Sequence, residues 1–134
     1  MIKVYIDAST KGNPGPSGGG ILILHEQVQE QLAVPLTEGS NHQAEFEVFL
    51  KTLEILKQRN LNGETILCYS DSKVLVSAID KDYTNNSSFI PLFHKIKDLL
   101  PEFQLLILQW VPENQNKGAD HLARQALQKQ LNHF

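Results

Sequence analysis

The chain has little cysteine, no long apolar run and no excess of positive charge, and each absence narrows its class. Cys68 is the single cysteine, so no internal disulfide can form and nothing indicates an oxidising compartment. No stretch approaches the roughly 20 apolar residues that a membrane-spanning helix needs, and no apolar signal segment follows the first residues. We therefore expect a cytoplasmic protein with no membrane partner.

The charge balance bears on nucleic acid as a partner. Twelve Lys and Arg residues stand against fifteen Asp and Glu residues, which gives a formal net charge of -3. Such a chain does not hold nucleic acid mainly through a broad basic surface. Four carboxylates gathered in one metal site would account for much of this acidity, because bound cations would offset them. The charge therefore weakens nucleic-acid binding as a prediction without excluding it.

Length and composition favour one folded domain. The chain has 134 residues, of which 41% are hydrophobic, enough for a packed core. It contains no internal repeat, low-complexity segment or interdomain linker. We expect a single domain over residues 1–134, monomeric and without an obligate protein partner.

Periodicity predicts the elements. Alternation of apolar and polar residues, or a short apolar run, indicates strands near 1–7, 20–25, 29–34, 65–71 and 103–111. Helical spacing indicates helices near 40–60, 72–80, 89–100 and 116–131, with Ser40 or Asn41 capping the first and Ser72 the second. The segment 8–20, rich in Gly and Pro, is expected to be a turn or loop. This β-β-β-α-β-α-α-β-α order predicts an α/β fold: a five-stranded mixed sheet with helices on both faces.

Four carboxylates occupy unusual places in this scheme. Asp7 is expected to close the first strand and Asp71 the fourth, so parallel neighbours would bring both to the carboxyl edge of the sheet. Glu45 and Asp120 fall on the apolar stripes of their helices. Buried ions without a partner lose several kcal/mol of solvation, by rough estimate. Shared Mg²⁺ or Mn²⁺ would compensate them, and two such ions about 4 Å apart can stabilise both the attacking and the leaving oxygen of a phosphodiester.

Each acid also has an ordinary interpretation. Asp7 and Asp71 can be turn residues or helix caps, and Glu45 and Asp120 can complement a helix dipole. It is the joint pattern that favours a metal site.

Four motifs carry a resemblance to a known family. DASTKGNPGP contains Asp7, NHQAE ends in Glu45, YSDSKVLVSAI contains Asp71, and WVPENQNKGADHLARQA contains Asp120. In order and spacing they resemble type 1 ribonuclease H, in the compact form that lacks the basic protrusion. The resemblance covers nearly the whole chain. It implies a ribonuclease H-like fold and a metal-dependent endonuclease that hydrolyses the RNA strand of RNA–DNA hybrids.

The resemblance also implies roles for individual residues. Asp7, Glu45, Asp71 and Asp120 would be catalytic and would bind two Mg²⁺ or Mn²⁺ ions. Contacts to the hybrid would come from small and polar residues: Gly12, Asn13, Ser40, Asn41, Ser72 and Asn116. Turn and cap chemistry is the alternative for these residues. The glycines of the 8–20 segment would supply positive φ angles and let the backbone approach a nucleic-acid strand.

Three departures from the family leave other functions open. Only KDYTNNSS connects the helices where larger members carry a basic handle, and no histidine lies between Trp110 and Asp120. His42 stands where the family often has asparagine. A ribonuclease H-like domain that binds nucleic acid or protein with little or no cleavage is the main alternative. A polynucleotidyl transferase or exonuclease on the same fold is another.

Overall fold

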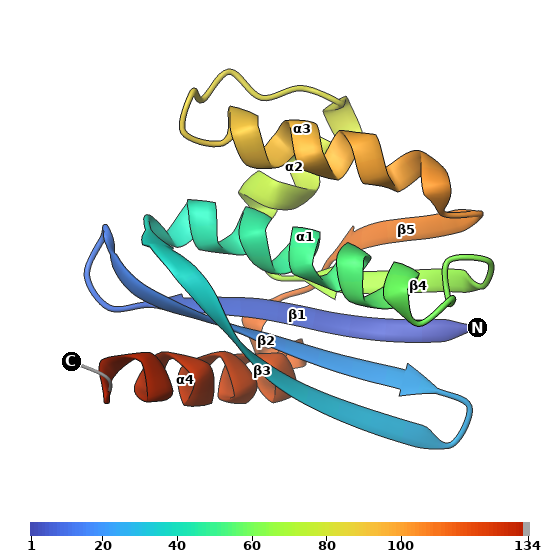
Figure 1. Ribbon diagram of the computed structural model, residues 1–134, viewed down its shortest axis with the longest axis horizontal. Helices are drawn as coiled ribbons and strands as arrows, with labels where there is room; N and C mark the ends of the chain where they lie inside the picture. Colours follow the sequence, from blue (N-terminus) through green and yellow to red (C-terminus); the bar gives the residue numbers. More distant parts are fainter. Residues whose placement is uncertain (133–134) are drawn as a thin grey trace.

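A five-stranded sheet forms the centre of the computed structural model, which describes residues 1–132 (Figure 1). Its strands run in the order β3-β2-β1-β4-β5, with bounds β1 Ile2–Thr10, β2 Gly15–His25, β3 Val28–Gly39, β4 Thr65–Ser70 and β5 Leu105–Trp110. The first three strands form an antiparallel meander, whereas β4 pairs parallel with both β1 and β5. The expected order of elements and the mixed sheet are confirmed.

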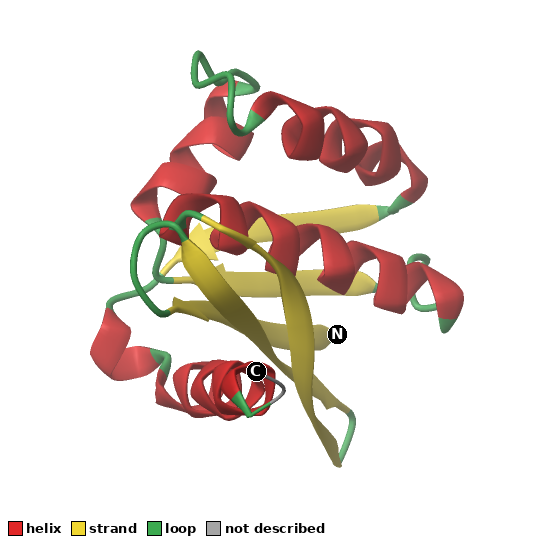
Figure 2. Cartoon of the chain, turned by 60° about the vertical axis from the view of Figure 1, so that its left-hand side comes forward, coloured by secondary structure: helices red, strands yellow, loops and turns green. Residues whose placement is uncertain are grey.

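Helices cover both faces of the sheet, as expected. Their bounds are α1 Asn41–Gln58, α2 Lys73–Lys81, α3 Ile90–Leu99 and α4 Lys117–Leu131, with short 3₁₀ turns at Leu100–Glu102 and Glu113–Gln115. On one face, α1 packs on β1, β2 and β3, α2 packs on β4 and β5, and α3 packs on α1. On the other face, α4 lies against β1, β2 and β3 (Figure 2). Within residues 1–132, no helix is both long and apolar enough to cross a membrane.

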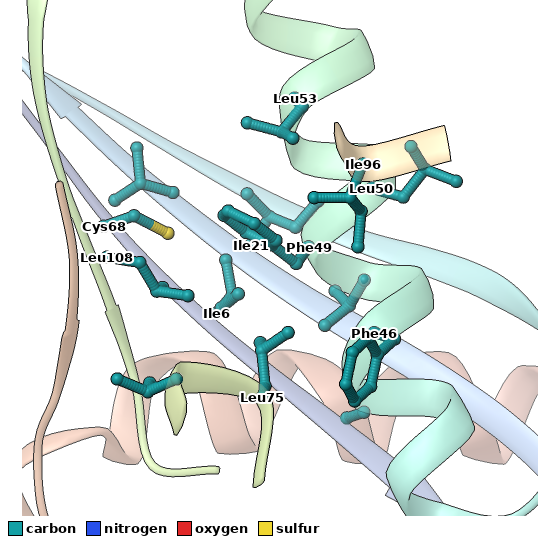
Figure 3. Close-up of a cluster of buried hydrophobic side chains, with 14 of the residues drawn as sticks. Ile6, Ile21, Phe46, Phe49, Leu50, Leu53, Cys68, Leu75, Ile96 and Leu108 are labelled. Atoms are coloured by element: carbon teal, nitrogen blue, oxygen red, sulfur yellow. The ribbon is translucent and has the colours of Figure 1, made fainter. Parts of the chain in front are cut away.

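The main core lies between the sheet and α1 (Figure 3). Ile6, Ile21 and Cys68 from three strands are buried, and Phe46 and Phe49 of α1 are buried with them. These apolar positions occur along α1 at helical spacing, which is why the helix forms against this face. Glu45 belongs to the same buried side of α1, so packing of the core sets its position.

The expected loop over residues 8–20 is wrong for most of its length. β1 continues to Thr10 and β2 begins at Gly15, so Asp7 lies inside a strand, paired with Gly20, rather than at its end. A Cβ on Gly20 would lie 2.1 Å from the Ala119 carbonyl oxygen of α4. Gly18 and Gly20 therefore leave a face of β2 without side chains, against which the backbone of α4 packs closely. Among the glycines of residues 1–132, only Gly12 has a positive φ, of 80°.

The hairpin is longer than expected at both ends. β3 continues past Pro35 to Gly39, because an edge strand tolerates a residue that cannot donate to a ladder. The two-residue turn Glu26–Gln27 replaces the expected turn over 26–28. The helix caps agree with expectation: the Ser40 hydroxyl accepts from the Gln43 N–H at 3.1 Å, and the Ser72 hydroxyl accepts from the Leu75 N–H at 3.2 Å.

Candidate metal site

Three of the four predicted carboxylates converge at one edge of the sheet. One oxygen from each of Asp7, Glu45 and Asp71 lies within 4.8 Å of the others. β1 and β4 are parallel and pair Ile6 with Ser70, so Asp71, the first residue after β4, lies beside Asp7. The capping box of Ser40 and Gln43 starts α1 and places Glu45 in its second turn, over the same edge. We call Asp7, Glu45 and Asp71 the inner trio.

Within residues 1–132, no Lys or Arg forms an ion pair with the inner trio. Burial, followed by the nearby Asp71 carboxylate, raises the pKa of Asp7 to about 8. Burial and then the Asp7 and Asp71 carboxylates raise the pKa of Glu45 well above its usual range. Burial also raises the pKa of Asp71, although a hydrogen bond from Asn116 opposes that shift. Burial in the folded protein therefore disfavours the charged forms of these acids.

Unpartnered oxygens at the site fit a divalent cation. Glu45 is 5% exposed, and its Oε2 atom is buried without a hydrogen-bond partner in residues 1–132. Such an atom is costly unless something satisfies it. The donors of the trio are all carboxylate oxygens, the ligands that Mg²⁺ and Mn²⁺ take. The inner trio could therefore hold a divalent ion of this type.

The fourth predicted carboxylate, Asp120, neighbours Asp7 but lies outside the 4.8 Å cluster of the trio. It lies in the first turn of α4 and lines the same pocket as Asp7. Its charge is close enough to contribute to the raised pKa of Asp7. The Nε atom of Arg124, one helical turn later, lies 3.2 Å from Oδ1 and 3.1 Å from Oδ2 of Asp120. The structure thus brings the four acids to one pocket, three of them in direct convergence and the fourth in an ion pair.

Two neutral side chains hold the Asp71 segment in place. Asn116, only 1% exposed, donates from Nδ2 to the Ile6 carbonyl at 2.8 Å and to Asp71 Oδ2 at 3.4 Å. The indole N–H of Trp110 donates to the Asp71 backbone carbonyl at 3.1 Å. Asn116 therefore links β1 to the end of β4 beside the inner trio.

The predicted substrate residues divide into two groups. Asn41 and Ser72 line the pocket of about 520 Å³ beside the inner trio, whereas Gly12, Asn13, Ser40 and Asn116 are not among its lining residues. Asn13 Oδ1 accepts the Asn41 N–H at 3.1 Å and so ties the β1–β2 loop to the start of α1. Ser40 and Ser72 act as helix caps, which is the turn-and-cap role that their sequence context also allowed.

Sequence reasoning missed two charged residues that line the pocket, Arg124 and Glu113. Arg124 lines the pocket and contacts Asp120, and its position four residues after that acid on a helix was the available signal. Lys73 also lines the pocket, with its ammonium 5.0 Å from the centroid of the Trp110 ring. His42 lines it as well, whereas His121 bonds to Gln125 and is not among the lining residues.

The sequence of the chain matches a known family. The family described as "Reverse transcriptase-like" matches residues 5–126. The protein "Putative hydrolase EbsB" of Enterococcus faecalis is 49% identical over 129 residues, which cover 96% of each chain. A ribonuclease H of Desulforamulus reducens is 32% identical over 83 residues, and the match spans 61% of this chain but only 49% of that relative.

The fold also matches solved structures. The chain is similar to LC11-RNase H1 in a crystal structure in complex with an RNA/DNA hybrid, with a TM-score of 0.80 and 26% identity. That similarity covers 98% of this chain and 99% of the other. The expected ribonuclease H-like fold is therefore confirmed.

Proposed function

The chain belongs to the reverse transcriptase-like family, whose fold here is that of ribonuclease H, and from that membership we propose that it hydrolyses the RNA strand of RNA–DNA hybrids. The proposed enzyme is an endonuclease that depends on Mg²⁺ or Mn²⁺. The LC11-RNase H1 structure contains such a hybrid, and the D. reducens relative is named a ribonuclease H, which supports this substrate class.

The observation that carries the proposal is the inner trio. Its three carboxylate oxygens lie within 4.8 Å of one another, at the edge of the sheet and beside an open pocket. A protein gains nothing in stability at neutral pH from three acids whose pKa values are raised by burial and by neighbouring carboxylates. Perturbed acids that meet in a pocket are typical of functional sites.

The residues of the chain have separable tasks in the proposed reaction. Asp7, Glu45 and Asp71 would hold the divalent cation, and Asp120 would complete the site for a second one. When bound, such ions activate water and neutralise charge on the phosphate. Asn116 fixes the orientation of Asp71 through its 3.4 Å hydrogen bond, and Trp110 holds the backbone of the same residue.

The hybrid would lie across the pocket mouth. We assign the phosphate-facing and sugar-facing contacts to Asn41, Ser72 and Lys73, which line the pocket. Asn13 would act indirectly, because its side chain holds the Asn41 backbone. Reading of the 2′-hydroxyl is how such a site distinguishes RNA from DNA.

A domain that binds nucleic acid without cutting it is the second candidate. The absence of a histidine between Trp110 and Asp120 favours it. The pocket lining does not, because five acids surround the pocket (Asp7, Glu45, Asp71, Glu113 and Asp120), against two cations, Lys73 and Arg124. This excess of negative charge should weaken the binding of nucleic acid and slow turnover unless metal cations fill the site.

Cleavage of labelled RNA–DNA hybrid in Mg²⁺ and in Mn²⁺ tests the proposal. Duplex DNA and duplex RNA serve as substrate controls. Asp71→Asn removes one member of the trio, and Asp80→Asn, at an exposed position on α2, is the matched control. We expect cleavage of the hybrid alone, lost with Asp71→Asn and kept with Asp80→Asn. Binding of the hybrid without hydrolysis in either metal would instead support the second candidate.

A further inference from the structure

Arg124 forms an ion pair with Asp120, a carboxylate that the proposed function requires as a metal ligand. Its Nε atom is within 3.2 Å of both oxygens of Asp120, so both are already engaged in the metal-free protein. A cation shared between Asp7 and Asp120 would have to take at least one of those oxygens. Arg124 and the ion are therefore competitors for the same carboxylate.

The rest of the guanidinium is free for another ligand. The Arg124 side chain is 73% exposed, lines the pocket, and donates to Asp120 through Nε. Its terminal nitrogens make no hydrogen bond to any of residues 1–132. Guanidinium groups favour bidentate pairing with phosphate. Lys73, the other cation of the pocket, has its ammonium over the Trp110 ring and lacks the planar fork that pairs with a phosphate in this way.

We propose that Arg124 exchanges partners, pairing with Asp120 in the free protein and with a backbone phosphate when nucleic acid and metal are bound. The phosphate half of this exchange rests on the proposed function. When Arg124 pairs with a phosphate, its ion pair with Asp120 is broken and Asp120 can bind the metal ion. When the metal ion binds Asp120, Arg124 can pair with the phosphate. Because linkage is reciprocal, each ligand then tightens binding of the other.

The pair is weak enough to exchange. Exposed ion pairs at this helical spacing contribute about 0.3–0.5 kcal/mol, and exposed pairs in general up to about 1 kcal/mol. Such a competitor lowers the apparent affinity for metal by about twofold to fivefold without blocking the site.

Calorimetric titration with Mn²⁺, without nucleic acid, tests the competition. Arg124→Gln should tighten Mn²⁺ binding about twofold to fivefold over the wild type. In an Asp120→Asn background the same change should alter the affinity by less than about 1.5-fold, because there is no carboxylate left to release. Lys129→Gln removes the same charge from an exposed position near the end of α4 and should have no effect.

Three results would overturn the competition. Equal tightening by Arg124→Gln in both backgrounds would reveal a long-range charge effect, and unchanged affinity would show that Arg124 does not compete. Restoration of the wild-type affinity by Arg124→Lys would indicate a charge effect and not the specific Nε contact, and would therefore also count against the proposed competition.

Fluorescence anisotropy of an RNA–DNA hybrid with a 2′-O-methylated RNA strand tests the phosphate half. Mn²⁺ should tighten hybrid binding by the wild type, and Arg124→Gln should reduce this gain while Lys129→Gln keeps it. An undiminished gain with Arg124→Gln would overturn the exchange. A wild type that binds Mn²⁺ as described but binds no hybrid would contradict the proposed function and the phosphate half, and leave the competition at Asp120 established.

Discussion

The inner trio and Asp120 share one pocket but are stabilised differently. Asp7 and Glu45 are each 5% exposed, and no Lys or Arg forms an ion pair with the trio within residues 1–132. The Asp120 side chain is 39% exposed and has Arg124 against both oxygens. Arg124 thus provides a counter-charge for Asp120, the outer acid, whereas the inner trio depends on a cation from solution.

This difference predicts a division of labour. Acids that the protein cannot satisfy create the demand for a metal ion, so the trio should control whether an ion binds at all. An acid that already has a counter-charge can only adjust how firmly a further ion is held. The two parts of the site should therefore respond very differently to the same Asp→Asn change.

The largest expected effect separates the two parts by cleavage rate. Asp71→Asn should lower hybrid cleavage by at least about 10³-fold, since loss of metal assistance removes several kcal/mol of transition-state stabilisation. Asp120→Asn should lower it by about 10- to 100-fold, because the trio stays complete. Initial rates at saturating Mn²⁺, with Asp80→Asn as the control, make the comparison. Equal losses for both variants would remove the distinction between inner and outer acids.

The fold and the acids were predictable to different depths. The hydrophobic periodicity of α1 and the alternation in β1 are local signals, and they indicated the order of elements and the burial of Glu45. The strand character of Gly18 was not predictable, because it depends on α4, some hundred residues away, whose backbone packs on it. The local composition of residues 8–20, rich in Gly and Pro, favours a loop instead.

The candidate site shows the same limit. Parallel pairing of β1 and β4 could be assumed, and it places Asp7 beside Asp71. The ion pair of Asp120 with Arg124 lay within reach of sequence reasoning, since i and i+4 residues of a helix are neighbours. The bond from Asn116 to the Ile6 carbonyl was beyond it, because no local pattern joins two residues so far apart in the chain.

The metal preference gives the next largest effect. We expect hybrid cleavage in Mn²⁺ to exceed that in Mg²⁺ by about tenfold, because Mg²⁺ demands near-ideal octahedral geometry and dehydrates reluctantly. A site with no histidine between Trp110 and Asp120 to assist the exchange of metal or product should suffer more under that constraint. Parallel titrations of both metals on one hybrid measure the ratio. Equal or higher maximal rates in Mg²⁺ would show that such a histidine is dispensable here.

A smaller effect concerns the stability of the metal-free protein. The folded state raises the pKa of Asp7 from 3.8 to about 8, through burial and then the Asp71 charge. The folded state therefore binds more protons than the unfolded state between these values, so this group's contribution to stability is complete below pH 4 and is lost as the pH rises through 8.

Asp71→Asn should offset part of that loss. In EDTA at pH 8 we expect its Tm to exceed that of the wild type by about 3–6 °C, which corresponds to about 1 kcal/mol for a chain of this size. At pH 5 the gain should shrink, because Asp7 is then mostly neutral. Thermal unfolding at both pH values, with Asp80→Asn as the control, provides the measurement. A gain that does not depend on pH would point to better packing instead of relieved repulsion.

The smallest expected effect is the dependence of hybrid affinity on salt. Two cations line the pocket, Lys73 and Arg124, and Lys11 and Lys117 lie exposed near the ends of β1 and α4. Each phosphate neutralised contributes about 0.7–0.9 to the slope of log affinity against log salt, so up to four contacts give a slope no steeper than about -3.6. Lys73→Gln should reduce the magnitude of this slope by less than about 1.

The acids dominate this pocket, so most of the affinity should depend on bound metal. Adding EDTA should therefore weaken binding more than doubling the salt concentration does. A slope that implies eight or more contacts would reveal a basic surface elsewhere on the molecule. Arg124 and Asp120 would then be a minor part of substrate binding.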